Sequence, residues 1–448
     1  TNTPTHMSPT LFKIFINDIT QNLLDNDSPK IDSTSNYRIP CLLYADDLVI
    51  FSTTKKGLQG KLNHLHEYCK HWGLAINREK TKVVIFTKTD PKLKHFFRCG
   101  ENIIETADEY KYLGVILYKN GSLIRAQEHL SKQATKALHA FRRTFQRTEI
   151  DINIILKMYD SLITPISTYG GEIWFPHRLE TKNKLNLPDL FKECLSNTFH
   201  HQKLHSKFCK QTLGVHKKAM LLPALGELGR FPITLNIICQ VITYWLHILD
   251  LSKTSHLRVI YDHIYSNSHD NDPWVSFVKQ SLQILGLNHV WKNQFTFSIQ
   301  RLRYIISEKL EAKYIEYWKE KVSSSSKLSF YKNATKGYQP AAYLSIADTK
   351  YKQALCKLRI SAHDLKIETG RYTNIPKDNR LCLKCGTLED EIHFLDKCNE
   401  YNDIRNNLMK HINNPVYMYD LPSQLINDDT LQLQLGKYVH ECFLKKKQ

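Results

Sequence analysis

The sequence has little glycine and few acidic residues for its length, and both shortages are informative. Only 16 glycines occur among 448 residues, and with 42% hydrophobic residues this excludes a disordered chain and indicates a globular protein of about two to four domains. Asp and Glu number 44 against 62 Lys and Arg, a formal net charge of +18. This imbalance indicates an anionic partner, nucleic acid ahead of a membrane surface. A generally basic surface is the alternative.

From the sequence we also expect no disulfide framework, no signal peptide and no membrane-spanning apolar run. Its 11 cysteines are irregularly spaced, which favours reduced thiols with one local metal site. The most apolar stretch, 231–249, is interrupted by Thr, Asn, Gln and His, so we expect a buried helix and no membrane partner. We expect an intracellular protein, in the nucleus and/or cytoplasm, that is not secreted. The first residue is Thr1 rather than Met, which suggests a fragment.

Hydrophobic spacing predicts a short α+β region followed by a long helical one. Ser8-Pro9 suits a helix start, and apolar residues then recur four apart, at Leu11, Phe15, Ile19 and Leu23. Two strands are expected around Ala45-Asp46-Asp47, then a helix that Gly73 ends, a strand at 82–87 and a turn at Asn120-Gly121. From about 123 to 320 the pattern is helical, and Ser323–Ser326 is a candidate linker.

The stretch LLYADDLVIF (42–51) places two adjacent carboxylates between two apolar runs. Asp46 and Asp47 on a tight turn repel each other unless a cation neutralises them. Hard divalent ions such as Mg²⁺ bind one or two carboxylates and keep positions for substrate phosphates, and two such ions serve nucleotidyl transfer. An ordinary Asp-Asp turn is the alternative, but a solvated loop would not need the apolar flanks.

Tyr44-Ala45-Asp46-Asp47 resembles the catalytic hairpin of reverse transcriptases, and its neighbours resemble that family in the same order. The helix SPTLFKIFINDI, the palm motif GLAINREKTKVVIF and the primer-grip motif YKYLGV are similar to family motifs. The later segments YDSLITPISTYGGEIW, LGELGRFPI and LGLNHVWKNQ are similar to the thumb and helical region of non-LTR (LINE-type) retrotransposon enzymes. The similarity covers nearly the whole sequence.

The resemblance implies an RNA-directed DNA polymerase that acts with two Mg²⁺ ions on an RNA template and a DNA target or primer. It implies that Asp46 binds the metal ion with Asp47 in support. It also implies that Lys80 or Lys82 protonates or neutralises the leaving pyrophosphate. The residues it implies in nucleotide or primer contact are Tyr44, Ala45, Tyr112, Leu113 and Gly114.

The chain departs from the family where a third carboxylate from an earlier strand should complete the metal site. Asp18 and Asp25 do not match that motif, and residues 1–7 lack the Gly-rich, Gln-containing loop. We therefore expect the C-terminal portion of an enzyme, separated from the N-terminal part of the same polyprotein and inactive alone. The alternative is a catalytically dead nucleic-acid-binding remnant.

Near the C-terminus, Cys382, Cys385, His393 and Cys398 form C-x2-C-x7-H-x4-C. Three thiolates and one imidazole suit tetrahedral zinc with no open position, so we expect a structural Zn²⁺, and Gly386 permits the tight turn. The pattern is similar to the zinc segment that follows the polymerase in LINE-type elements. The acidic run 389–391 is expected to form a solvated face.

A second cluster, HHQKLHSKFCK (200–210), holds three histidines and a cysteine at four-residue steps. A metal site is one interpretation, a plain solvated helix another. A basic helix that touches a nucleic-acid backbone is the functional alternative. Its phosphate contacts would be Lys203, Lys207, Lys210, Lys217 and Lys218.

The predicted fold class is α+β: a truncated polymerase palm with a helical thumb, then a mostly α-helical body and a small zinc-binding C-terminal segment. The predicted boundaries are 1–90 for the partial palm, 91–180 for the primer-grip hairpin and thumb, 181–322 for a helical connector, and 327–448 for the C-terminal region with its zinc knuckle at 382–398.

Overall fold

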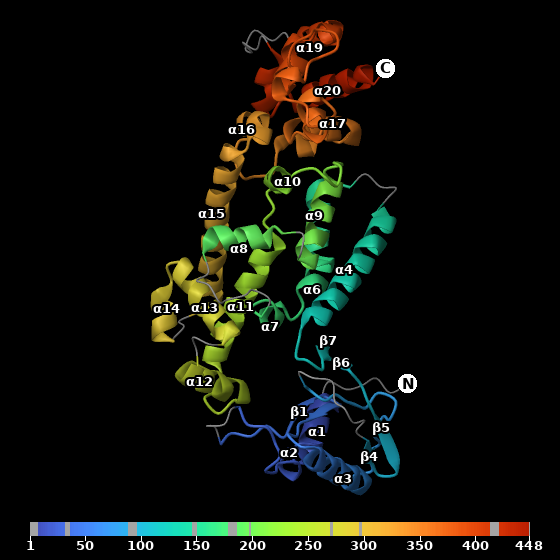
Figure 1. The fold of residues 1–448 in the computed structure, drawn as a ribbon, viewed down its shortest axis with the longest axis vertical. Coiled ribbons are helices and arrows are strands. Elements are labelled where there is room, and N and C mark those ends of the chain that lie inside the picture. Colours follow the sequence, from blue (N-terminus) through green and yellow to red (C-terminus); the bar gives the residue numbers. More distant parts are fainter. Residues whose placement is uncertain are drawn as a thin grey trace. The chain divides into compact units, whose positions relative to one another are not determined.

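The protein is described here from a computed structural model, which is mixed α/β and mostly helical (Figure 1). The structure describes residues 8–31, 36–87, 96–145, 150–177, 186–196, 199–268, 272–294, 298–412 and 421–447. Two compact units divide the chain: the first comprises 1–129 and 250–275, the second 130–249 and 276–448. The predicted boundaries at 90, 180 and 322–327 remain predictions.

The first unit contains all the strands of the described residues, arranged in three small sheets. Its hairpins are β1–β2 and β6–β7, and a three-stranded sheet has the order β3-β5-β4. The strands are β1 (Cys41–Tyr44), β2 (Asp47–Ile50), β3 (Lys82–Val83), β4 (Phe97–Cys99), β5 (Asn102–Thr106), β6 (Glu109–Tyr112) and β7 (Val115–Tyr118). The helices are α1 (Ser8–Phe15), α2 (Ile19–Asn22), α3 (Lys55–His71) and α12 (His256–Ser268).

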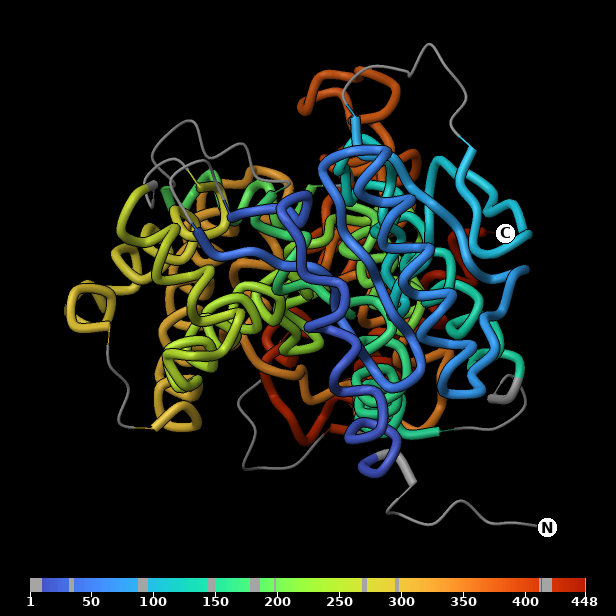
Figure 2. The backbone as a smooth tube through the Cα atoms, turned by 90° about the horizontal axis from the view of Figure 1, so that it is seen from below, coloured from blue at the N-terminus to red at the C-terminus, as the bar shows by residue number. Residues whose placement is uncertain are grey.

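Helix α3 organises the core of the first unit. Its Leu65 and Cys69 pack with Ile19 and Leu23, and its Leu62 packs against β4 and β5. The hairpin β1–β2 joins the same core, and these elements lie together in blue in Figures 1 and 2. The predicted stop at Gly73 is confirmed, since α3 ends at His71 and Gly73 has φ +64°.

Two predicted elements of the first unit differ from the structure. The helix expected from Ser8 to Leu23 is interrupted between α1 and α2, and Leu11 and Phe15 are exposed while Ile19 and Leu23 are buried. A four-residue spacing keeps residues on one face only along a continuous helix, and the interruption after Phe15 ends that register. The strand expected over 82–87 is short, and only Lys82–Val83 pairs, parallel to β5.

The second unit is mostly helical, as predicted, and its described residues contain no strand longer than the isolated bridge between Leu381 and Leu388. The unit boundaries fall within α4 (Ile124–Phe145) and α13 (Pro273–Ile284) and at the end of α11 (Ile233–Asp250). The other helices are α5 (Ile152–Leu162), α6 (Thr164–Thr168), α7 (Gly171–Trp174), α8 (Leu187–Cys194), α9 (His200–Thr212), α10 (Leu221–Leu228), α14 (Asn288–Asn293), α15 (Ile299–Ser324), α16 (Ser329–Ala334), α17 (Thr349–Arg359), α18 (Lys366–Tyr372), α19 (Asn402–Ile412) and α20 (Gln432–Lys446). Short turns are η1 (Ser326–Leu328), η2 (Ala342–Ser345), η3 (Lys377–Asn379), η4 (His393–Lys397), η5 (Asn399–Tyr401) and η6 (Pro422–Asn427).

Helix α11 confirms the prediction of a buried helix at 231–249. It is apolar and long enough to cross a membrane by length and composition, but 67% of that window is buried inside the protein. Ile237, Ile238 and Trp245 are fully enclosed, and Trp245 stacks on Trp291 of α14. This is how the central helix of a folded core packs.

Helices α17 and α20 pack along each other and carry the C-terminal segment (orange to red in Figure 1). A buried ion pair ties this region to α10, because Arg359 donates from Nε and Nη2 to the Glu227 carboxylate at 2.9 and 3.1 Å. The linker expected at Ser323–Ser326 is wrong. Helix α15 continues through Ser324, and η1 follows with buried Leu328.

Candidate functional site

The predicted hairpin around the two aspartates is present. Strands β1 and β2 pair antiparallel with Tyr44 opposite Asp47, so Ala45 and Asp46 form a two-residue turn. Buried Cys41 and the partly buried Leu43, Leu48 and Ile50 join the core, whereas Asp46 and Asp47 are exposed. The apolar flanks therefore fix the strands, and the carboxylates project from the tip.

The turn holds Ala45 in a left-handed conformation. Its φ is +52°, a region that costs a residue with a Cβ roughly 1–2 kcal/mol. Two-residue hairpins favour glycine at such a position because the turn must match the twist of the strands. Ala45 therefore has a strained backbone conformation directly before Asp46.

A second hairpin lies beside the first. Strands β6 and β7 pair with Tyr112 opposite Val115, and the turn residues Leu113 and Gly114 have φ of +45° and +86°. Burial raises the pKa of the Tyr112 phenol, and the negative charge of Asp47 raises it further. The structure therefore brings together Tyr112 and Asp47, which the sequence assigned to two separate motifs.

The two candidate lysines differ in their surroundings. Lys82 forms an ion pair with Glu105 across the β3–β5 pairing. Lys80 lies in an exposed turn, where its backbone N–H donates to the Asn77 side chain. The side chain of Lys80 therefore faces solvent, whereas the side chain of Lys82 is held by its ion pair with Glu105.

The acidic residues upstream of the hairpin have structural partners. Tyr68 donates a hydrogen bond to Asp18 at 2.7 Å, and Asp25 pairs with the buried Lys61 at 3.1 Å. Within the described ranges, the hairpin carboxylates gather no third ligand, because the grouping of three or more potential metal ligands found there is the C-terminal Cys/His set.

Cys382, Cys385, His393 and Cys398 converge as predicted. Their ligand atoms all lie within 4.8 Å of one another. The Sγ of Cys398 is 3.9 Å from that of Cys382 and 3.7 Å from that of Cys385. Four ligands at a zinc–sulfur distance of about 2.3 Å on a tetrahedron would place sulfurs about 3.8 Å apart.

Local backbone geometry builds this cluster. Gly386 has φ +67° and its N–H donates to the carbonyl of Cys382 at 2.9 Å, which closes the predicted turn between the first two cysteines. The π-helical turn η4 brings the last two ligands together, since the N–H of Cys398 donates to the carbonyl of His393 at 2.8 Å. A histidine and cysteine five residues apart fit one such turn.

The donor set fits a zinc ion. His393 has Nδ1 next to the Thr387 hydroxyl at 3.2 Å, while its buried Nε2 has no hydrogen-bond partner. Burial raises the pKa of Cys398 to about 12, so a cation is needed for this thiol to ionise at neutral pH. An orphaned imidazole nitrogen among three thiols is the arrangement that a tetrahedral ion satisfies.

The expectation that 389–391 forms a solvated face is wrong. Glu389 and Glu391 are only 6% and 5% exposed. Glu389 pairs with Lys446 and accepts from the Lys366 N–H, and Glu391 accepts from Ser361 and contacts His363 Nε2 at 3.0 Å. These partners are 57, 23, 30 and 28 residues away along the chain, so no local pattern signals them.

Helix α9 is a core helix with a basic outer face. His201, His205 and Cys209 are buried, and His201 contacts Ser167 while His205 contacts Arg230. His205 and Cys209 are buried among apolar and aromatic groups. His200 is exposed, so it does not share a surface with them. The plain solvated helix is therefore wrong.

The five lysines assigned to this region take different positions. Lys203 and Lys207 are exposed on the outer face of α9, and Lys217 and Lys218 are exposed in the loop after it. Lys210 is partly buried and donates to the Lys217 carbonyl at 3.0 Å, and burial lowers its pKa. Tyr372, which the sequence did not indicate, lies close to Lys218, and Lys327 also lies close to the Tyr372 ring.

Comparison with known proteins agrees with the hairpin geometry. Residues 5–117 match the family described as Reverse transcriptase (RNA-dependent DNA polymerase). A putative uncharacterized transposon-derived protein of Caenorhabditis elegans is 27% identical over 164 residues, 36% of this chain and 58% of that protein. A probable RNA-directed DNA polymerase from transposon BS of Drosophila melanogaster is 26% identical over 139 residues, 29% of this chain and 15% of that protein.

The chain thus spans little more than half of one relative and about a seventh of the other. The matched segment contains both hairpins, β1–β2 and β6–β7, apart from the last residue of β7. Through residues 5–117 the chain is thus similar to reverse transcriptases, and both relatives come from transposons.

Proposed function

We propose that Asp46 and Asp47 hold Mg²⁺ and serve nucleotidyl transfer in an RNA-directed DNA polymerase. The observation that carries this proposal is the strained two-residue turn, which projects two adjacent carboxylates beside Tyr112. Both side chains are exposed, and hard carboxylate oxygens are the ligands that Mg²⁺ prefers. Bound Mg²⁺ would stabilise the charge that develops on the transferring phosphoryl group.

The residues of this chain would act by binding and positioning. Tyr44 and Ala45 would line the nucleotide and primer surface, and Tyr112, Leu113 and Gly114 would hold the primer terminus beside Asp47. Lys80 would offer its ammonium group to the leaving pyrophosphate. The substrates proposed are an RNA template and a DNA primer or target.

A second candidate function rests on the incomplete carboxylate set. Because the described residues offer no third ligand at the hairpin, this chain alone would bind nucleic acid without extending it. Lys203, Lys207, Lys210, Lys217 and Lys218 would contact the phosphate backbone, the sequence-independent part of such binding. The third carboxylate would come from outside the described residues.

A primer-extension assay separates the two functions. The 448-residue chain is incubated with Mg²⁺, an RNA template and an annealed DNA primer, beside the double variant Asp46→Asn, Asp47→Asn. We expect binding without extension in both samples. Template-dependent synthesis that the double variant abolishes would replace the binding-only function with a complete polymerase.

For the C-terminal cluster we propose a structural Zn²⁺ held by Cys382, Cys385, His393 and Cys398. The sulfur separations and the unpartnered His393 Nε2 support this. Four protein ligands leave no position for substrate, so the ion would hold the segment together and not take part in chemistry.

The state of the cysteines bears on location. All 11 are free thiols in the structure, nine of them buried and two, Cys239 and Cys385, partly buried. Reduced thiols are the usual state inside cells, so we propose a nuclear or cytoplasmic location. Fractionation of cells that express the tagged chain tests this location. Secretion of the chain into the medium would contradict it.

A further inference from the structure

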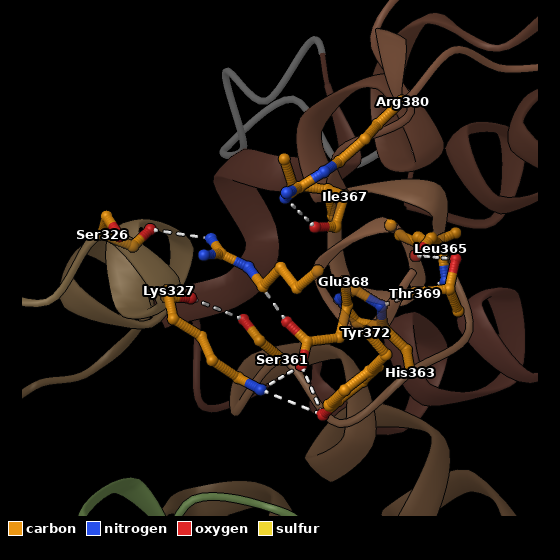
Figure 3. A network of polar contacts seen from close by, with 12 residues as sticks. Ser326, Lys327, Ser361, His363, Leu365, Ile367, Glu368, Thr369, Tyr372 and Arg380 are labelled. Carbon is orange, nitrogen blue, oxygen red and sulfur yellow. Dashed lines mark hydrogen bonds and ion pairs between the residues drawn. The ribbon is translucent and has the colours of Figure 1, made fainter. Parts of the chain in front are cut away.

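A group of cations surrounds an exposed tyrosine in the second unit. The group, called here the Tyr372 cluster, comes from the end of α9, the loop before α10, the turn η1 and helix α18. Figure 3 shows its centre, where Lys327 and Tyr372 converge on Glu368. The members of the cluster are Lys210, His216, Lys218, Lys327, Arg371 and Tyr372.

The ring of Tyr372 is accessible and lies near two ammonium groups. Tyr372 is 55% exposed, and Nζ of Lys327 and Nζ of Lys218 lie 5.5 and 5.9 Å from its ring centroid. Its hydroxyl donates to Glu368 at 2.8 Å, so the inner edge of the side chain is anchored. The hydroxyl of Tyr372 thus makes an internal contact, whereas its ring faces solvent.

Helix α18 is fixed by the segment that carries the Cys/His set. The N–H groups of Lys366 and Ile367 both donate to Glu389, to its carboxylate at 2.7 Å and to its carbonyl at 3.0 Å. On the other side, Ser361 donates to the carbonyl of Lys327 at 3.2 Å and to Glu391 at 2.9 Å. Tyr372 therefore projects from a well-supported element, which lowers the entropy cost of binding.

Positive charge exceeds negative charge around the ring. The buried Glu368 is shared by Lys327 and by Arg371, whose Nε lies 3.3 Å away. Burial lowers the pKa of His216, and the nearby charges of Lys327 and Lys210 lower it further, against the opposing effect of Asp364 and Glu368. The carboxylates of Glu368 and Asp364 do not neutralise the four cations of the cluster, so the surface attracts anions.

We propose that the Tyr372 cluster binds single-stranded nucleic acid, with one base stacked on the Tyr372 ring and the flanking phosphates at Lys218 and Lys327. An exposed aromatic ring among lysines is the combination that single strands use, because an unpaired base has a free face. A base inside a duplex is stacked on both sides and offers only its phosphates. The inference builds on the proposal that lysines of this unit contact a nucleic-acid backbone, and it adds the stacking residue and the single-strand preference.

The ring is tested with a pair of variants that both lose the hydroxyl. Tyr372→Phe keeps the aromatic face, whereas Tyr372→Leu keeps bulk alone. Tyr304 on α15 supplies a matched control, since it is 63% exposed and its hydroxyl donates to Glu308, also four residues away. Each full-length variant is titrated against fluorescent oligouridylate, oligodeoxythymidylate and a DNA duplex of equal length, at two salt concentrations.

We expect Tyr372→Phe to bind the single strands about as tightly as the unmodified chain, and Tyr372→Leu roughly tenfold more weakly. Tyr304→Leu should leave binding unchanged, and duplex binding should be equal in all variants. Equal single-strand affinity of the Phe and Leu variants would overturn stacking on Tyr372. An equal loss for single strands and duplex would overturn the single-strand preference.

The phosphate contact is tested separately with Lys218→Gln and, as a control, Lys309→Gln on the exposed face of α15. Lys218→Gln should reduce the slope of log affinity against log salt by about one phosphate contact, and Lys309→Gln should not. If the lysine variant weakens binding and the two Tyr372 variants are equal, the backbone proposal stands and the stacking proposal fails. If the unmodified chain binds no oligonucleotide at low salt, both fail.

Discussion

Tyr112 at the end of β6 lies beside Asp47 at the start of β2, so that the charge of the carboxylate acts on the phenol. Burial raises the pKa of Tyr112 and Asp47 raises it further. The two residues are 65 positions apart in sequence; Asp47 directly follows the turn of its hairpin, and Tyr112 directly precedes the turn of the other. The two hairpin tips thus lie close together, which gives the metal proposal a spectroscopic readout independent of polymerase activity.

Neutralising Asp47 is expected to lower the pKa of Tyr112, because a nearby negative charge disfavours the phenolate. Asp47→Asn should do this permanently, and Mg²⁺ should do it reversibly if it binds the hairpin. NMR titration of ¹³C-labelled tyrosine measures both effects. Tyr68, whose pKa burial and Asp18 raise to about 12, is the internal control and should not respond. A Tyr112 pKa that ignores saturating Mg²⁺ would argue against metal binding at Asp47.

The turn of the second hairpin carries removable strain. Leu113 has φ +45° directly before Gly114, a left-handed pair in which asparagine is favoured at the first position. Leu113→Asn is expected to stabilise the β6–β7 hairpin by about 0.5–1 kcal/mol. Hydrogen exchange of the hairpin amides measures it. The control is Leu24→Asn, because Leu24 is an exposed leucine with an ordinary φ, and this substitution should give no stabilisation. Equal stabilisation by Leu24→Asn would show that relief of backbone strain is not the cause.

Local signals explain what the sequence could predict. The strands around Ala45-Asp46, the helix that ends before Gly73 and the Cys-x2-Cys turn with Gly386 all depend on residues within a few positions of one another. Composition also identified the burial of α11, because its long apolar stretch is interrupted by polar residues. The expectation of one helix at 8–23 failed, because the chain interrupts the helix between Phe15 and Ile19.

Long-range pairing explains the rest. The run of acids at 389–391 looks solvated by composition, yet two of them meet cations or donors from α18, α20 and the segment at 361–363. Four consecutive serines look like a linker, yet buried Val322 and Leu328 hold them between helices. In both places tertiary contacts override local preference, and a single sequence does not reveal those contacts.

A structural zinc should be present in about one equivalent per chain and should be needed for the fold around it. Cys398→Ser is expected to abolish zinc retention, measured by metal release to a colorimetric chelator, while Cys239→Ser, a partly buried thiol outside the set, should retain it. Chelation should also speed exchange of the Ile367 amide, which donates to Glu389. The assignment would be contradicted by a chain that contains no zinc and whose amide exchange rates do not change when the chelator is added.

The buried Lys61 is expected to be the main polar support of the first hairpin. Its Nζ donates to Ser28 Oγ at 2.6 Å and to the Phe51 carbonyl at 2.7 Å, and pairs with Asp25. Lys61→Met leaves these acceptors without their donor, so the free energy of unfolding of this unit should fall by about 3 kcal/mol. Denaturant unfolding of the full chain, with β1–β2 amide exchange as the local probe, measures the loss.

Asp25→Asn should cost less, about 1 kcal/mol, because the side chain of Asp25 is 39% exposed and water replaces part of the interaction. Burial opposes ionisation of Asp25, but Lys61 and Ser28 outweigh it and lower its pKa below 3.8. A carboxylate with a lowered folded-state pKa contributes stability that is complete above its unfolded value, about 3.9, and is lost as pH falls through the folded value. The unmodified chain should therefore lose hairpin protection below about pH 4 more steeply than Asp25→Asn. Parallel pH profiles for the two chains would mean that Lys61 supports the hairpin through Ser28 and Phe51 alone.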